Sequence, residues 1–348
     1  MRVDSPVTLT RVLLAVGALA AAMGSVSAQP VPDDDAINLD VMTFNIRTSA
    51  IDDGDDAWPY RKDLVAETIS RFHPHVVGLQ EVVAEQTAYL EDALPGYRWL
   101  GVDRGLNGGA GLSEATPIWY RYEEIVPIES GTFWLGDPPG AGAGAAGRGA
   151  PDGGAGRGGQ DGGAGRGAPD GGTGRGGQDG GGRAGSGRGG RGGGGGRGGS
   201  RIATWARFHH FESGRQFYVF NTHFSPREGP QHVEAMALIS ERIAALPAGS
   251  SVILLGDFNS AAGTSDAWRA ATSQGFRDVW TIASERHGPP FTSNGFGPPP
   301  AEGDWRIDWI LVSGSIEASS VSTVVRSARG RYPSDHYPVV ATLRVHPG

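Results

Sequence analysis

The stretch VILLGDFN, residues 252–259, holds the pattern on which the fold prediction rests. A short apolar run at 252–255 is followed at once by Gly256, Asp257, Phe258 and Asn259. A carboxylate beside an apolar run is costly to bury unless a cation or hydrogen-bond donors compensate its charge. The pattern therefore predicts a buried strand whose polar end belongs to a functional site.

Other strand-like segments carry polar residues in the same way. They read TFNIR (43–47), GLQEV (78–82), FNTHF (220–224) and RIDWI (306–310), and SDHYP (334–338) begins a further strand. In the fourth segment, Asp308 is expected inside the strand, between Ile307 and Trp309, where burial requires a specific partner. Polar groups at strand ends can converge on one rim of a sheet.

Each of these residues also has an ordinary explanation when it is taken singly. Asn45 could form a turn, Glu81 could start a helix, and Asp257 or Asp335 could cap a loop. His223 could be a hydrogen-bonded core histidine. All of them together, in this order, are hard to explain as caps, so we expect one functional site.

Strand and helix patterns alternate along the rest of the chain. Helical spacing occurs at 64–72 and from 229 to 243, and the strand-like segments are 37–45, 76–79, 118–121, 130–135, 201–211, 216–222, 252–255, 306–312 and 337–345. About ten strands against four or five helices predict an α/β (α+β) fold. Two mixed sheets packed face to face with helices outside fit this count better than a single doubly wound sheet.

An insert at 140–200 interrupts this pattern. Of the 58 glycines in the chain, 33 lie between 140 and 199, and an 18-residue unit at 147–164 recurs at 165–182. The insert has eight arginines, four aspartates and no aromatic residue, so we expect a flexible loop, while binding of a polyanion is the alternative. Because both flanks read as neighbouring strands, residues 29–139 and 201–348 should form a single domain.

Residues 1–28 have the pattern of a secretory signal peptide. Arg2 and Arg11 precede an apolar run at 12–23, and VSA at 26–28 provides a small-residue cleavage site. We expect cleavage near Ala28 and a secreted or periplasmic protein, with an uncleaved anchor as the alternative. No later segment is apolar enough to span a membrane.

Charge and cysteine content narrow the chemistry. Outside 1–28 and 140–200 the chain has 20 basic and 33 acidic residues, a net charge of −13, which argues against a broad basic face for nucleic acid. The chain has no cysteine, so a metal would need oxygen or imidazole ligands. Mg²⁺ is the first expectation, with Mn²⁺ or Ca²⁺ possible.

The segments quoted above resemble the endonuclease/exonuclease/phosphatase superfamily, which has the deoxyribonuclease-I-like four-layer α/β sandwich. The resemblance covers about 37–139 and 201–345. It implies metal-dependent cleavage of a phosphoester. In that likeness Glu81 is the main metal ligand, and Asn45 and Asp335 complete the shell through oxygen or bridging water.

The resemblance also implies roles in proton transfer. Asp257 would take the proton from the attacking water, and Asn259 would orient that water. His336 would donate a hydrogen bond to a phosphate oxygen or protonate the leaving group, with Asp308 holding its other ring nitrogen. His223 matches a second histidine of nuclease-like and sphingomyelinase-like members and is a candidate partner acid.

Two substrate-binding candidates carry open alternatives. Arg47 lies two residues after Asn45, on the same strand face, and could contact the phosphate, although a surface salt bridge explains it equally well. Tyr120 matches a strand near the site, although core packing is as plausible. The acidic loop at 52–56 is expected at the substrate rim or as an exposed turn.

The leading hypothesis is therefore a secreted, magnesium-dependent phosphoesterase that acts on a phosphodiester. Its substrate class stays open among nucleic acid, a phospholipid head group and a small phosphorylated metabolite. We expect a monomer without a stable protein partner. The alternative is a catalytically silent binding protein on the same fold that uses the Arg-Gly insert to hold a polyanion.

Overall fold

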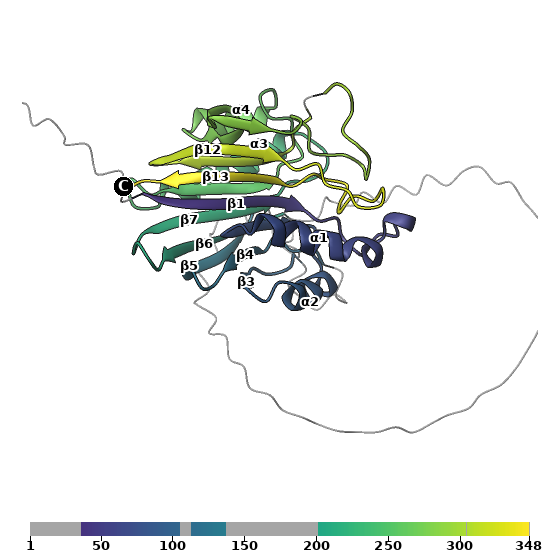
Figure 1. The fold of residues 1–348 in the computed structure, drawn as a ribbon. Coiled ribbons are helices and arrows are strands. Elements are labelled where there is room, and N and C mark those ends of the chain that lie inside the picture. Colours follow the sequence, from purple (N-terminus) through teal and green to yellow (C-terminus); the bar gives the residue numbers. More distant parts are fainter. Residues whose placement is uncertain (1–35, 105–112, 137–200, 304, 348) are drawn as a thin grey trace, which may run out of the picture. The chain divides into compact units, whose positions relative to one another are not determined.

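The computed structural model describes residues 36–104, 113–136, 201–303 and 305–347 (Figure 1). The expected signal peptide at 1–28 and the whole insert at 140–200 lie outside the described residues. None of the described helices has both the length and the apolar character that a membrane crossing requires.

The first sheet has seven strands in the order β10-β12-β13-β1-β2-β4-β3. Its central strand β1 (Ile37–Asn45) runs parallel to β2 and antiparallel to β13, which lies beside it in Figure 1. The remaining bounds are β2 Val76–Gln80, β3 Tyr97–Leu100, β4 Ile118–Arg121, β10 Glu285–His287, β12 Ile316–Thr323 and β13 Val339–Val345.

The second sheet has six strands in the order β5-β6-β7-β8-β11-β9. Their bounds are β5 Ile125–Trp134, β6 Ile202–His210, β7 Gln216–His223, β8 Val252–Asp257, β9 Arg277–Asp278 and β11 Asp308–Ser313. β5 and β6, which precede and follow the insert, pair antiparallel with Trp134 opposite Ile202. The chain on either side of the insert therefore meets within one sheet.

The two sheets pack face to face. One buried apolar cluster combines residues of β1 and β2, such as Leu39, Val41 and Val76, with Phe217, Ile253 and other residues of β7 and β8. In β1 the side chains alternate between this cluster and the opposite face, as the strand period of two requires. The alternating pattern read at 37–45 is thus the pattern of a central strand.

Helices cover both outer faces. On the first sheet, Met42 and Phe44 of β1 share a cluster with residues of α1 (Trp58–Phe72) and α2 (Ala84–Ala93). On the second sheet, Leu254 and Trp309 pack with residues of α3 (Pro230–Ala244) and α4 (Asp266–Ser273). A 3₁₀ turn, η2 (Gly54–Asp56), and a short helix, α5 (Val279–Ile282), complete the elements. The predicted four-layer α/β sandwich is confirmed.

The register brings the polar strand ends to one end of the sandwich. Asn45 at the end of β1 is opposite Gln80 at the end of β2, and His223 at the end of β7 is opposite Asp257 at the end of β8. β11 runs the other way, so its first residue, Asp308, pairs with Asp257. We expected Asp308 inside its strand, but the structure places it at the first position of β11. Because β11 is antiparallel to β8, the start of β11 lies beside the end of β8 at the rim.

Candidate active site

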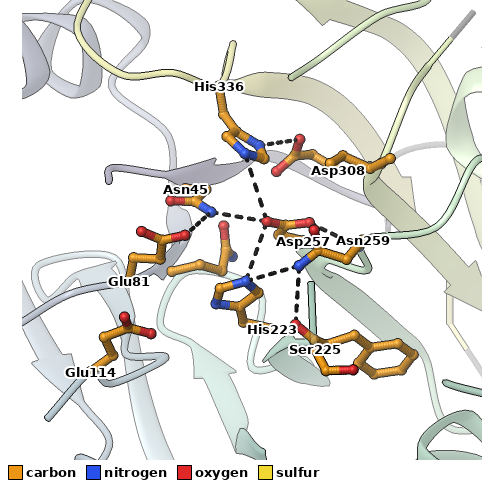
Figure 2. Close-up of polar contacts among 12 residues, drawn as sticks. Asn45, Glu81, Glu114, His223, Ser225, Asp257, Asn259, Asp308 and His336 are labelled. Carbon is orange, nitrogen blue, oxygen red and sulfur yellow. Dashed lines mark hydrogen bonds and ion pairs between the residues drawn. The ribbon is translucent and has the colours of Figure 1, made fainter. Parts of the chain in front are cut away.

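Asp257 lies at the centre of the rim, between side chains of both sheets (Figure 2). The Asn45 Nδ2 group donates to Asp257 Oδ2 at 2.9 Å, and the backbone N–H of Asn259 donates to Oδ1 at 2.9 Å. His223 Nε2 and His336 Nε2 lie 3.4 and 3.9 Å from Oδ2. The carboxylate is therefore surrounded by hydrogen-bond donors, although its side chain is buried.

Asn45 joins the two sheets through its amide. Nδ2 also donates to Glu81 Oε1 at 3.1 Å, while Oδ1 accepts from the backbone N–H of Arg47 at 3.0 Å. These contacts fix the amide orientation, because a backbone N–H requires an oxygen and the carboxylates require a donor. We expected Asn45 to complete the metal shell through oxygen or bridging water. In this structure its nitrogen faces both carboxylates, so Asn45 bridges Glu81 and Asp257.

Glu81 and Asp335 form an acidic pair next to Asn45. Glu81 Oε2 accepts from the backbone N–H of Thr48 at 3.1 Å, and Asp335 Oδ2 lies 3.6 Å from Arg47 Nη1. Burial raises the pKa of Asp335, and the charge of Glu81 raises it further. Two hard carboxylates in the same site, Asp335 with a raised pKa, fit a divalent cation, which would offset both charges.

A second set of side chains also has the geometry of metal ligands. In the described ranges, Asp257, Asp308 and His336 have ligand atoms within 4.8 Å of one another. However, His336 Nδ1 is 2.9 Å from Asp308 Oδ2, the distance of a hydrogen bond. Burial alone would lower the pKa of His336, but Asp308 and Asp257 raise it well above its usual value. A protonated ring cannot bind a cation, so this set fits proton transfer better.

The environment of Asp257 suits a group that changes its protonation state. Burial, followed by the charge of Asp308, raises the pKa of Asp257 to about 7, against the opposing effects of His336 and Asn45. Oδ1 of Asp308 is buried and has no hydrogen-bond partner within the described residues. The His336 ring thus lies between two acids, with Nε2 on the side of Asp257.

His223 occupies the other side of Asp257. Burial and then the charges of Arg201 and Arg104 lower the pKa of His223 well below its usual value. A ring held in its neutral form does not suit the expected role of partner acid. It can instead donate or accept one hydrogen bond at the site.

Three of the six described non-glycine residues with a positive φ lie at the same rim. Arg47, Glu81 and Asn259 have φ angles of 55°, 61° and 46°, in the left-handed region that residues other than glycine avoid. Such conformations cost free energy and persist at sites where the surrounding structure holds a side chain in a required position. Each of these residues directly follows, or lies two positions after, the end of a strand.

The two expected substrate-binding residues have different placements. Arg47 lies beside Asp335, but its guanidinium also forms a bidentate pair with Asp53, with Nε and Nη2 at 3.0 and 2.9 Å from the carboxylate oxygens. Tyr120 is opposite Val76, at the end of β2 far from Gln80, and its ring lies 5.3 Å from Phe208 in the core. The structure therefore does not bring Tyr120 into the site, and the packing alternative describes its position.

Three residues that support the rim had no role in the sequence prediction. Gln80 Nε2 donates to Asn221 Oδ1 at 2.7 Å, and Asn221 Nδ2 donates to Leu79 O at 2.8 Å, which joins the sheets beneath Asn45. Ser334 Oγ donates to Asn45 O at 2.7 Å and ties the loop of Asp335 to β1. Gln80, Asn221 and Ser334 belong to the quoted segments, so their position beside the acids was the available signal.

A comparison with protein families agrees with this geometry. The profile of the endonuclease/exonuclease/phosphatase family matches residues 42–336. No curated protein sequence matches the chain.

Several solved structures are similar over most of the chain. An endonuclease/exonuclease/phosphatase protein from Bacteroides vulgatus is 27% identical, with a TM-score of 0.68, and the match covers 89% of this chain and 100% of that chain. A mannosyl-6-phosphatase from Bacteroides thetaiotaomicron is 25% identical, with a TM-score of 0.65 and coverages of 88% and 99%. TDP2 from D. rerio, solved with a single-stranded DNA product, is 16% identical, with a TM-score of 0.57 and coverages of 88% and 98%, and this likeness concerns the fold alone.

Proposed function

The chain belongs to the endonuclease/exonuclease/phosphatase family, and we propose that it is an exported, divalent-metal-dependent phosphoester hydrolase. The observation that carries the proposal is the convergence of polar strand ends from both sheets on Asp257, with an acidic pair on one side and two histidines around it. Export rests on the signal-peptide pattern at 1–28.

Glu81 and Asp335 are the proposed metal ligands, and Asn45 orients Glu81 through its amide nitrogen. When it is bound, a divalent cation would offset the charge of the phosphate and of its transition state. Mg²⁺ fits a pair of hard carboxylates best, and Mn²⁺ or Ca²⁺ would accept the same ligands. Arg47, beside Asp335, is placed to contact a phosphate oxygen.

The proton-transfer steps use Asp257 and His336. Asp257 takes a proton from water as the water oxygen bonds to phosphorus, and the backbone N–H of Asn259 donates to Oδ1 and holds this acceptor in place. The phosphorus–oxygen bond to the leaving group breaks, and His336 delivers its Nε2 proton to that oxygen. Asp308 holds Nδ1–H, which fixes the ring and favours its charged form.

The substrate class follows from the family only in outline. The similar mannosyl-6-phosphatase makes a sugar phosphate a candidate alongside nucleic acid and phospholipid head groups. The acidic body favours a small phosphoester or a short segment of polymer over a duplex gripped along its backbone. A phosphodiester substrate remains our proposal.

Purified protein should be assayed on a nitrophenyl phosphodiester, single-stranded DNA, RNA, sphingomyelin vesicles and mannose 6-phosphate, each with and without chelator. We expect turnover of at least one substrate that chelator abolishes and Mg²⁺ restores. Glu81→Ala should lose that turnover, whereas Glu85→Ala, which removes an exposed acid bonded to Ser49, should keep it. Turnover that is unchanged in chelator would refute the metal-dependent mechanism. Binding of a polyanion without turnover would favour the silent binding protein.

A further inference from the structure

The His223 ring is held from both sides by groups of fixed chemistry. Arg201 Nη1 lies 3.1 Å from Nδ1. On the other side, Nε2 lies 3.4 Å from Asp257 Oδ2 and 3.1 Å from Asn259 Nδ2. Figure 2 shows the contacts of the ring with Asp257 and Asn259. The position of the ring hydrogen follows from these neighbours.

A guanidinium has only N–H donors, so Nδ1 must present its lone pair to Arg201. A neutral imidazole carries one N–H, and that hydrogen is therefore on Nε2, facing Asp257 Oδ2. The competing contact with Asn259 Nδ2 would require the opposite tautomer. Asn259 Nδ2 already donates to Phe224 O at 3.0 Å, and a charged donor forms the stronger hydrogen bond, so the Arg201 contact prevails.

We propose that Arg201 is a positioning residue of the active site, which fixes His223 in the tautomer that donates from Nε2 to Asp257. The inference rests on the proposed function, in which Asp257 accepts the proton of water. In this arrangement Asp257 accepts hydrogen bonds from Asn45 Nδ2 and the Asn259 backbone, and the N–H at His223 Nε2 faces Oδ2 from a third direction, with the two atoms 3.4 Å apart. These donors hold the carboxylate in one orientation and favour its ionised form.

The charge of Arg201 acts on acids of the rim, first on Glu114 and then on Asp257. In the described ranges it forms no ion pair, and its buried Nε has no hydrogen-bond partner. Glu114, the acid whose charge raises the pKa of Arg201 most, is already paired with Arg104 through Nη2 of that residue. A half-buried guanidinium that has no ion-pair partner among the described residues is costly, so a purely structural purpose would be served better by an apolar side chain.

The backbone keeps the guanidinium in place. Arg201 directly precedes β6, and its carbonyl accepts from the backbone N–H of Leu135 at 2.7 Å. β6 pairs with β7, with Ala203 opposite Thr222, so the register of two strands sets the distance between Arg201 and His223. Without the guanidinium, the ring could accept from Asn259 at Nε2, and Asp257 would lose one donor.

The test uses Arg201→Met, Arg201→Lys and the matched control Arg121→Met. Arg121 Nη1 also lies 2.9 Å from a histidine Nδ1, that of His73, but on the surface outside the site. Nitrogen-15 chemical shifts of histidine-labelled protein, with the His223 signals identified from His223→Gln, report which ring nitrogen is protonated. We expect Nε2–H in the wild type and in the control, and a shift toward Nδ1–H in Arg201→Met.

Turnover should fall about ten- to hundredfold in Arg201→Met, with the Michaelis constant nearly unchanged. Residues that orient the ligands of a metal ion have effects of this size, and Arg201 orients His223 in the same way. Arg201→Lys should recover part of the loss, and Arg121→Met should match the wild type. A wild-type His223 protonated at Nδ1 would overturn the inference, and so would an Arg201→Met protein with normal turnover. The wild-type spectrum decides the tautomer even if Arg201→Met does not fold, or if no phosphoester is turned over and the proposed function fails.

Discussion

Asp257 and Asp308 are direct partners in the antiparallel ladder of β8 and β11, and their carboxylates face the same His336 ring. The pKa of Asp257 is raised by burial and then by the charge of Asp308 on the neighbouring strand. A protonated His336 between them offsets part of this cost. The pairing thus gives the site an acid and a base whose protonation states depend on each other.

His336→Ala and Asp308→Asn should each lower turnover by about a hundredfold or more, because the first removes the proton donor and the second removes the group that holds its charged form. Steady-state rates at saturating substrate measure the effect. Asp278→Asn is the control, since Asp278 is a buried acid paired with Arg306. It should lower the melting temperature and leave turnover of the folded protein unchanged.

A comparison of Asp308→Asn with Glu81→Ala shows which residues bind the cation. Calorimetric binding of Mn²⁺ should persist in Asp308→Asn and be lost in Glu81→Ala if Glu81 and Asp335 hold the metal. The reverse result would assign the metal to Asp257, Asp308 and His336, whose ligand atoms also lie close together. Rates within about threefold of the wild type in both His336→Ala and Asp308→Asn would refute the acid–base pairing.

The polar rim was predictable because its signal is local. An apolar run followed by Asp257, or by Gln80 and Glu81, can be read within a few residues, and the structure brings these strand ends together. A local sequence pattern does not show which residues of two neighbouring strands are paired. Tyr120 lies in the strand expected for it, but pairing with Val76 places it at the end of β2 away from the site.

Contacts between residues that are far apart in the sequence could not be predicted for the same reason. Arg201 reaches His223 only because β6 and β7 pair in one register, and nothing in the residues around Arg201 indicates that partner. The short strands β9 and β10 have two and three residues, too few for a periodic pattern, and they exist because neighbouring strands offer free edges. Asn45 was correctly placed at the rim, but the orientation of its amide depends on the backbone N–H of Arg47.

Gly78→Ala should destabilise the fold by about 1 to 3 kcal/mol, because the space between the sheets is filled. A Cβ at Gly78 would lie 2.7 Å from Asn221 Oδ1 and 3.1 Å from Leu255 Cβ. Asn221 cannot move aside easily, since Gln80 donates to its Oδ1. Gly96→Ala, where a Cβ meets no atom within 4 Å, is the control and should be nearly neutral in chemical denaturation. Equal stabilities for the two variants would contradict the close approach.

His75 should make stability fall between about pH 6.5 and pH 4. Nδ1 accepts from the Asp40 backbone at 3.0 Å, and Nε2 lies 3.0 Å from Glu124, so charging the ring breaks the Asp40 bond. Burial and then Arg121 lower the pKa of His75 to about 4, and His210 acts in the same direction, against Glu124 and Asp40. The unfolded chain therefore binds the proton first as the pH falls.

The measurement compares the unfolding free energy of the wild type and His75→Gln at about pH 7 and about pH 4.5. Glutamine can accept from Asp40 and donate to Glu124 without titrating. The wild type should lose about 2 kcal/mol more than the variant over this range, an amount reduced from the full shift because the ring is partly exposed. The other histidines titrate in both proteins and cancel. An equal loss in both would show that His75 is not a source of acid sensitivity.

Deleting residues 140–199 should leave the melting temperature and metal-dependent turnover intact. Trp134 is opposite Ile202, and the backbone N–H of Leu135 donates to Arg201 O at 2.7 Å, so β5 and β6 hold both flanks together without the insert. The insert has no apolar surface to offset the entropy of ordering its glycines. If its eight arginines recruit an anionic polymer, deletion would raise the Michaelis constant for DNA or RNA and flatten the salt dependence, while a small diester is unaffected. Assays of both proteins at two salt concentrations separate these results, and a melting temperature lowered by many degrees would refute both.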